Sequence, residues 1–176
     1  MKCGKMFQKL KQKFKNLKYN QGKEQISYGD VIAYYDVSLT QGGVLSVIPF
    51  RYRDDFSVSV MQITDEVPPH TDSEIKTAIN FYIQPGSYMT KFFSVKEGAT
   101  IYQVENQTNG VIFDKKDLLM CGVFIANAGD GWLLDVTEPH AVEAIKTGTS
   151  RTAITLGTDK HTYEEVKQML HETGNL

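Results

Sequence analysis

Short β-prone segments separated by turn residues fill most of the chain after Asp30. Each segment is rich in β-branched and aromatic residues, and glycine, proline, asparagine or aspartate stands between neighbouring segments. The segments that we expect to be strands are residues 31–37, 44–50, 56–63, 76–84, 91–95, 100–104, 132–136, 140–145 and 151–157. Several short strands at this spacing predict a mainly β fold, either a sandwich or a barrel, with helices at its flanks.

Residues 76–84 predict which face of one strand is turned inward. Successive side chains of a strand point to opposite faces, so Ile79 and Phe81 share one face while Asn80 and Tyr82 share the other. If the apolar face packs outward on helices, Asn80 and Tyr82 face the barrel interior, where a bound acid needs hydrogen-bond donors. The alternative is that Tyr82 merely fills the barrel.

A histidine and an aspartate two residues apart, His70 and Asp72, follow a pair of prolines. In an extended segment both side chains aim at one point, which makes them two ligands of a metal site. His140, at the head of another apolar segment, supplies a third ligand. Two histidines and one carboxylate on one face suit a non-haem Fe(II) centre. Taken singly, His70 and Asp72 could instead cap or open turns.

Arg151 begins the last expected strand, and residues 146–150 form the turn before it. We therefore expect His140 and Arg151 on adjacent strands of one hairpin. The guanidinium could hold the far carboxylate of a dicarboxylic acid through two charge-assisted hydrogen bonds. Thr155 shares the face of Arg151 and is a second candidate for this pocket. The alternative for Arg151 is a surface ion pair of little energetic consequence.

The ordered set His70-x-Asp72, His140 and Arg151 resembles the HxD…H…R pattern of the Fe(II)- and 2-oxoglutarate-dependent oxygenases. Residues 129–136 are similar to small single-domain members of that family, many of them encoded by bacteriophages, and the likeness covers about residues 55–158. The resemblance implies a double-stranded β-helix, a jelly-roll or cupin-like barrel. One difference is Ala153, where many relatives have a serine, so a hydroxyl for the acid must come from elsewhere.

What the resemblance implies chemically is the hydroxylation of a substrate C–H bond. Fe(II) would be held by His70, Asp72 and His140. The reaction would consume 2-oxoglutarate and O2 and release succinate and CO2. The resemblance does not decide whether the substrate is a nucleotide, a nucleobase or a protein side chain. The alternative function is a metal-binding cupin-like barrel without 2-oxoglutarate turnover, which acts as a binding module through its basic N-terminus.

Charge divides the chain into unlike regions. Residues 1–23 carry eight lysines and no acid, whereas the rest carries a net charge of −10. Residues 1–20 place Met6, Leu10, Phe14 and Leu17 at helical spacing, which predicts a basic amphipathic helix. Through residues 2–18 it could bind nucleic acid or another anionic partner, or it could pack on the barrel.

Two further boundaries complete the predicted organisation. The jelly-roll domain is expected over residues 24–158 and a capped helix over residues 159–176. Residues 117–126 fit either a short helix or a strand, and residues 106–110 form a polar loop that we expect near the mouth of the site.

The size and the cysteine content fit one domain in a reducing compartment. A chain of 176 residues closes a single core, and none of its apolar runs approaches the ~20 residues that span a bilayer. Only Cys3 and Cys121 occur, and the first lies in a terminus that we expect to be mobile. We therefore predict no structural disulfide, a buried free thiol at Cys121 and a cytoplasmic protein, in the host cytoplasm if a phage encodes it.

Overall fold

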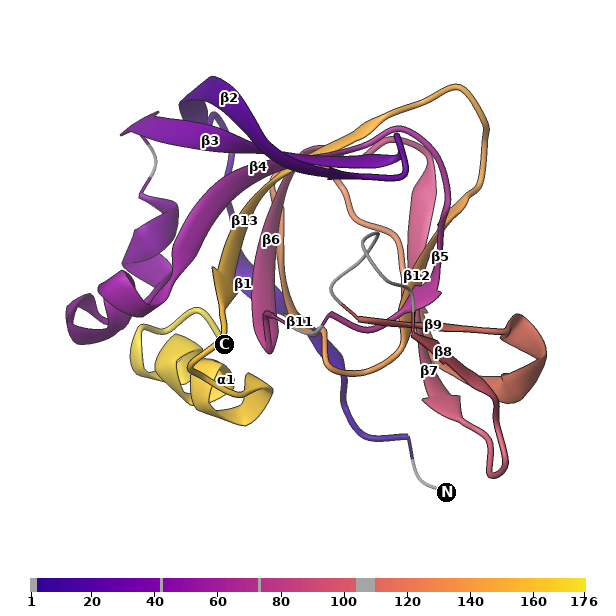
Figure 1. Cartoon of the computed structure of the whole chain (residues 1–176). Coiled ribbons are helices and arrows are strands. Elements are labelled where there is room, and N and C mark those ends of the chain that lie inside the picture. The colour runs from indigo at the N-terminus through magenta and orange to yellow at the C-terminus, as the bar shows by residue number, and fades with distance from the viewer. Residues whose placement is uncertain (1–2, 42, 73, 104–109) are drawn as a thin grey trace.

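Two antiparallel β-sheets face each other in the protein, as the computed structural model shows for residues 3–41, 43–72, 74–103 and 110–176 (Figure 1). The larger sheet, sheet A, has the strand order β1-β11-β6-β13-β4-β3-β2, and sheet B has the order β10-β7-β12-β5-β9-β8. The strands of sheet A are β1 (Phe7–Lys13), β2 (Lys18–Tyr28), β3 (Ile32–Gln41), β4 (Ser57–Ile63), β6 (Thr77–Gln84), β11 (Asp130–Asp135) and β13 (Arg151–Thr158). Those of sheet B are β5 (Val67–His70), β7 (Tyr88–Val95), β8 (Ile101–Gln103), β9 (Val111–Phe113), β10 (Leu118–Phe124) and β12 (His140–Ala144).

The connections between the sheets make the fold a jelly roll. Along the chain β4, β6, β11 and β13 enter sheet A, while β5, β7, β10 and β12 enter sheet B. Neighbours among these eight strands are therefore never consecutive in the chain, and they pair antiparallel, which is the arrangement of a double-stranded β-helix. The predicted mainly β, cupin-like fold with flanking helices is confirmed.

Two hydrophobic cores lie on the two faces of sheet A. On the outer face Ile79 and Phe81 pack with Val166 and Leu170 of the C-terminal helix α1 (Tyr163–Glu172), which covers this side of the sheet in Figure 1. On the inner face Ala78 and the ring of Tyr82 belong to the core between the sheets. The predicted orientation of residues 76–84 is thus confirmed, because the apolar face is held by a helix and the mixed face is left for the interior.

The N-terminal helix predicted over residues 1–20 is wrong, because the chain there forms β1 and the start of β2. β1 pairs with the edge of sheet A through β11, where Lys9 lies opposite Trp132. The register shifts between Lys9 and Lys13. This irregularity lets Leu10 and Phe14 both reach the outer core, so a bulged strand reproduces the four-residue spacing that predicts a helix.

Salt bridges also fasten β1 to the sheet. The ammonium nitrogens of Lys9 and Lys13 lie 2.9 and 2.7 Å from the carboxylate of Asp130, whose side chain is fully buried. Burial alone would raise its pKa, but Lys13, the backbone N–H of Asn127 and Lys9 together lower the pKa of Asp130 to about 2. Two of the lysines that predicted a solvated helix face therefore compensate a buried charge at the edge of the sheet.

The strand predicted at residues 44–50 is also wrong. This stretch forms the 3-10 helices η1 (Val44–Val47) and η2 (Phe50–Asp55), with Pro49 as the N-cap of the second. Val44 and Val47 are both buried in the outer core, and a separation of three residues places them on one side of a 3-10 turn. Residues 117–126, open between helix and strand, contain the strand β10, which follows the 3-10 turn η3 (Lys115–Asp117).

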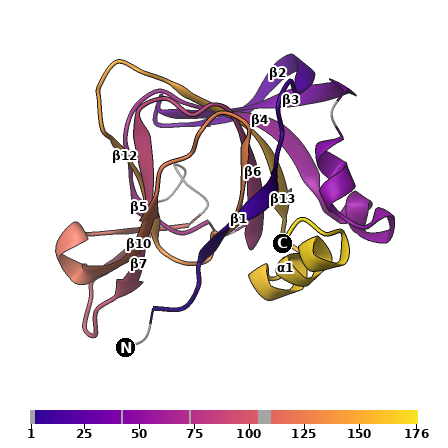
Figure 2. The ribbon, with the colours of Figure 1, turned by 180° about the vertical axis from the view of Figure 1, so that it is seen from behind.

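Cys3 and Cys121 form a disulfide, contrary to the prediction that both are free thiols. Their Cα atoms lie 5.4 Å apart although 118 positions separate them in sequence. The segment that precedes β1 leaves sheet A, as Figure 2 shows from behind, and the disulfide ties its Cys3 to β10 of sheet B. The reducing compartment was inferred from unpaired cysteines, and this pairing removes that ground.

The C-terminal helix predicted within residues 159–176 is present as α1. α1 begins with the predicted capping box, in which Thr162 and Glu165 bond to each other's backbone N–H. Within the described ranges no helix is long and apolar enough to cross a membrane. Of the expected polar loop, residues 106–109 lie outside the described residues, as does Val104 of the strand predicted at 100–104.

Candidate metal centre

The three predicted ligands lie close together on the inner face of sheet B, which is turned to the cavity. His70 ends β5 and lies directly opposite His140 of the neighbouring β12, with ring centroids 4.3 Å apart. Asp72 follows two residues later, and its Oδ1 is 3.5 Å from Nε2 of His70. One ligand atom from each residue falls within 4.8 Å of the others. Ligands at right angles and about 2.1 Å from a metal lie about 3 Å apart, so the three groups fit a single ion.

Backbone carbonyls orient both imidazoles for ligation. Nδ1 of His70 is 2.8 Å from the carbonyl oxygen of Pro68, and Nδ1 of His140 is 2.9 Å from that of Glu138. A carbonyl only accepts, so Nδ1 carries the proton and donates, which leaves the lone pair of each Nε2 for a metal. In both cases the acceptor stands two residues before the histidine, and a proline, Pro69 or Pro139, stands between them.

The charges of the three side chains suit a cation. Burial lowers the pKa of His70, but the hydrogen bond and the charge of Asp72 outweigh it and raise that pKa. Burial likewise opposes the ionised form of Asp72, yet His70 and His140 lower its pKa. Burial and then His70 lower the pKa of His140 to about 4, so this imidazole is neutral near pH 7. A metal would therefore replace the proton shared by His70 and Asp72.

Arg151 lies in the same cavity with its charge uncompensated by protein. Its side chain is only 1% exposed. Nε donates to the carbonyl of Pro85 at 3.2 Å, Nη2 to that of Tyr88 at 3.0 Å and Nη1 to the hydroxyl of Thr90 at 2.8 Å. Among the described residues no carboxylate forms an ion pair with it. A buried cation without an anion is costly, so the alternative of a surface ion pair is wrong.

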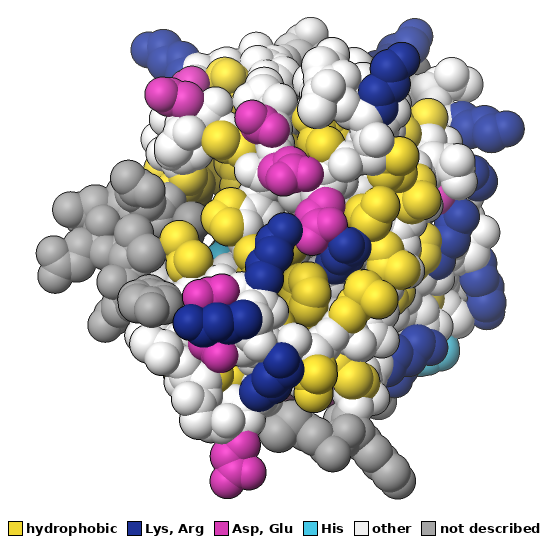
Figure 3. Space-filling view, turned by 90° about the vertical axis from the view of Figure 1, so that its right-hand side faces the viewer, with side chains coloured by type: hydrophobic (Ala, Val, Ile, Leu, Met, Phe, Trp, Pro, Cys, Tyr) yellow, Lys and Arg dark blue, Asp and Glu magenta, His cyan; other side chains and the backbone are white. Residues whose placement is uncertain are grey.

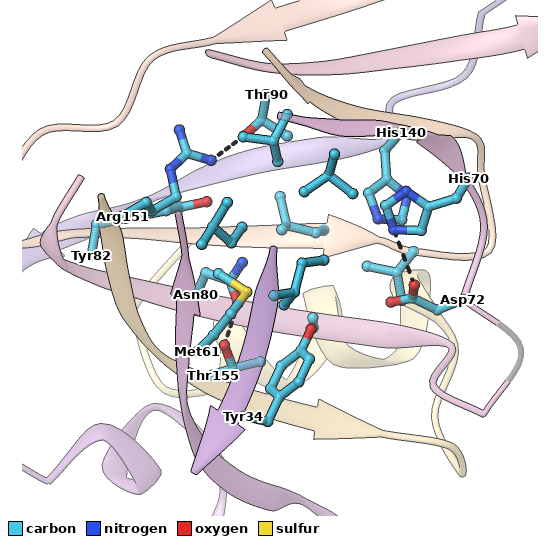
Figure 4. A pocket seen from close by; sticks show the side chains of 17 residues that line it. Tyr34, Met61, His70, Asp72, Asn80, Tyr82, Thr90, His140, Arg151 and Thr155 are labelled. Atoms are coloured by element: carbon cyan, nitrogen blue, oxygen red, sulfur yellow. Dashed lines mark hydrogen bonds and ion pairs between the residues drawn. The ribbon is translucent and has the colours of Figure 1, made fainter. Parts of the chain in front are cut away.

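The predicted pocket residues line one cavity of about 60 Å³. Figure 4 shows Arg151 and Thr90 at one end and the two histidines with Asp72 at the other. The predicted residues along it are Asn80, Tyr82 and Thr155, and the hydroxyl of Thr155 donates to Oδ1 of Asn80 at 2.9 Å. The ring of Tyr82 lies 5.1 Å from the guanidinium of Arg151, which makes it a support for that cation as well as a filler.

One predicted relation between these residues is wrong. His140 and Arg151 do not occupy adjacent strands, because β12 belongs to sheet B and β13 to sheet A. The turn at residues 146–150 carries the chain from one sheet to the other instead of closing a hairpin. The metal ligands and the arginine consequently face each other across the barrel interior rather than side by side.

Among the lining residues that the sequence did not predict are Tyr34, Met61 and Thr90. Thr90, on β7 of the other sheet, carries the hydroxyl that accepts a hydrogen bond from Arg151. Burial and then the charge of Asp72 raise the pKa of Tyr34, whose phenol therefore stays protonated. The strands predicted at residues 31–37 and 56–63 contain Tyr34 and Met61, which pair with each other. Their sequences alone do not show which face of each strand is turned to the cavity.

No protein-family model matches the sequence, and no curated protein matches it. Solved structures of similar fold include hydroquinone 1,2-dioxygenase in complex with Cd2+ and 4-hydroxybenzonitrile, at 11% identity and a TM-score of 0.39, covering 59% of this chain and 58% of that one. Hydroxypropylphosphonic acid epoxidase from S. wedmorenis in complex with fosfomycin has 13% identity and a TM-score of 0.40, with 83% and 57% covered. A cupin-like protein from Thermotoga maritima has 12% identity and a TM-score of 0.37, with 85% and 94% covered.

The chain spans less than two thirds of the dioxygenase and epoxidase chains. At these identities and TM-scores the likeness concerns the β-rich fold alone. The chemistry of the site therefore has to come from the residues of this chain.

Proposed function

We propose that this chain is an Fe(II)- and 2-oxoglutarate-dependent dioxygenase that hydroxylates a substrate C–H bond and releases succinate and CO2. The observation that carries the proposal is the cavity shared by the His70, Asp72 and His140 cluster and the buried, unpaired guanidinium of Arg151. A metal cluster alone would fit many cupin-like proteins. A buried cation at the far end of the same cavity adds a demand for an anionic group there.

The protein groups divide the work between the two ends of the cavity. His70, Asp72 and His140 would hold Fe(II), a metal that such a two-histidine, one-carboxylate set accepts with positions left open. When bound, Fe(II) supplies the redox chemistry that couples O2 and 2-oxoglutarate to hydroxylation of the substrate. Arg151 would hold the far carboxylate of 2-oxoglutarate. The apolar lining excludes water, which strengthens these polar contacts.

The hydroxyl of Thr90 orients Arg151 and is placed to share in binding the acid. It accepts a hydrogen bond from Nη1 and keeps its own proton for a carboxylate oxygen. Asn80 and Thr155 border the same space between the two ends. The substrate stays undecided between a nucleotide, a nucleobase and a protein side chain.

The test is an anaerobic titration of the metal-free protein with Fe(II) and then 2-oxoglutarate. Binding of the keto acid to protein-held Fe(II) is expected to produce a metal-to-ligand charge-transfer band, which His140→Ala abolishes. Admission of O2 should then release succinate. Tight Fe(II) binding without a band or succinate would favour the alternative, a metal-binding barrel that does not use 2-oxoglutarate.

Binding of an anionic partner by residues 2–18 remains a proposal, although the segment contains the strand β1 and not the predicted helix. Lys11 and Lys15 are exposed, while Lys9 and Lys13 bind Asp130. Lys11→Glu combined with Lys15→Glu should abolish any salt-sensitive binding of a single-stranded oligonucleotide. Binding that the double variant leaves unchanged would refute a role for this segment.

A further inference from the structure

Exposed apolar side chains gather on the outer side of sheet B. Eight large hydrophobic residues are exposed in the described chain. Three of them lie on β10, a fourth follows that strand directly, and a fifth follows β12 on the other side of β7. We call these five the apolar strip: Leu119, Met120, Val123, Ile125 and Ile145. Figure 3 looks at this side of the molecule and shows hydrophobic side chains beside a group of basic and acidic ones.

Strand register puts most of the strip on one face. Met120 lies opposite Phe93 and Val123 opposite Lys91, both on β7. Phe93 belongs to a small core on the outer face of the sheet, whereas its neighbour Phe92 belongs to the core between the sheets. Side chains of paired residues point to the same face, so Met120 and Val123 face outward, away from the cavity. Leu119 lies opposite Ser94, one position before Met120, and therefore points to the other face.

The exposed area is that of a large apolar patch on a protein surface. The five side chains are between 45% and 59% exposed. Without Leu119 the other four correspond to roughly 350–400 Å² of apolar surface, within the range of about 300–600 Å² found for the largest, often functional, patch of a protein. Two such strips pressed together bury about 700–800 Å², so the surrounding polar rim has to supply the rest of the roughly 1,200–2,000 Å² of a stable interface.

We propose that the apolar strip is the interface between two copies of this chain, related by a two-fold axis. A two-fold axis brings a surface against itself, so the surface must not repel its own copy. β10 contains no charged residue and is an edge strand of sheet B, with only β7 beside it. Around the strip Glu143 pairs with Lys91 at 2.5 Å and with Lys115 at 3.2 Å, which gives the polar rim of both signs that protein interfaces have.

The proposed interface is independent of the proposed chemistry. Thr90 and Val142 of sheet B line the cavity, while Lys91 and Glu143, the next residues on the same strands, lie at the rim of the strip. Dimerisation therefore uses the other face of the sheet and leaves the cavity in each copy complete.

The experiment measures the mass of the full chain by analytical ultracentrifugation over a series of concentrations. Met120→Lys and Ile125→Lys each place a charge in the strip, and Ile26→Lys is the matched control, an exposed residue of β2 at the edge of the other sheet. We expect a dimer that Ile26→Lys preserves and that each strip variant weakens by roughly 100-fold or more. Thermal melting and metal binding confirm that the variants are folded.

Three results would overturn the proposal. The first is a wild-type chain that remains monomeric at every concentration. The second is a dimer that both strip variants leave intact. The third is a monomer that binds lipid vesicles through the strip, which would make a membrane the occupant.

Discussion

Replacing Arg151 by methionine removes the guanidinium but keeps an unbranched apolar side chain in the cavity. A guanidinium has five N–H donors, and three of those of Arg151 are used by Pro85, Tyr88 and Thr90. One N–H on Nη1 and one on Nη2 are left. These two are available to the two oxygens of a carboxylate, which predicts a contact through both terminal nitrogens.

The size of the effect follows from these two donors. A hydrogen bond to a charged group contributes about 1.5–3 kcal/mol, so losing two costs roughly 3–6 kcal/mol of binding free energy. At about 1.4 kcal/mol for each factor of ten, Arg151→Met should weaken 2-oxoglutarate binding by roughly 100- to 20,000-fold. Affinity for Fe(II) should change little, because Arg151 lies at the opposite end of the cavity from the ligands.

The assay is the anaerobic charge-transfer titration with 2-oxoglutarate at saturating Fe(II). Arg51→Met is the matched control, because this arginine is exposed and pairs with Glu172 outside the cavity. Its affinity should equal that of the wild type. If Arg151→Met binds 2-oxoglutarate as tightly as Arg51→Met does, the guanidinium does not hold the acid and the assignment of the cavity fails.

Three other predictions follow from the structure. Asp72→Ala should weaken Fe(II) binding by more than roughly 100-fold, since loss of a residue that only orients a metal ligand already lowers metal affinity by about 10- to 100-fold. Isothermal titration calorimetry measures this affinity, and an unchanged value would show that Asp72 is not a ligand. Asp130 has a folded-state pKa of about 2 against about 4 when unfolded, so it adds roughly 2–3 kcal/mol of stability that is complete above about pH 4 and lost as the pH falls through about 2. Urea unfolding of the wild type and of Asp130→Asn should therefore differ at pH 7 and converge toward pH 2, and a constant difference would contradict this account. Reduction of the Cys3–Cys121 disulfide, or the double change to serine, should lower the free energy of unfolding by roughly 3–5 kcal/mol, and equal melting temperatures with and without a dithiol reductant would show that the bond adds nothing.

Local sequence was sufficient for the parts of the site that lie within one strand. The pair His70 and Asp72 needed only the two-residue repeat of an extended chain. The inward side of β6, with Asn80, followed from the same alternation. His140 and Arg151 were identified by their order along the chain, but their position in opposite sheets depends on the path of the turn between them, which local pattern does not contain.

The spacing of apolar residues gave a wrong prediction where a helix and a strand would bury the same side chains. The spacing of Leu10 and Phe14 suits a helix, yet a bulged strand buries the same residues and also pairs its backbone with β11. The distance between Cys3 and Cys121 likewise depends on where β1 joins the sheet. The pattern of one segment does not show whether a sheet edge elsewhere in the fold is free to pair with it.

The sequence by itself determined the β-rich class of the fold, the identity of the residues proposed to hold a metal and the presence of an arginine suited to an acid. Only the tertiary structure decided that the ligand atoms converge, that Thr90 bonds Arg151, and that the arginine is buried without a counter-ion. The physical reason is range: alternation and turn chemistry act over a few residues, whereas burial and charge compensation are set by strands brought together from distant parts of the chain.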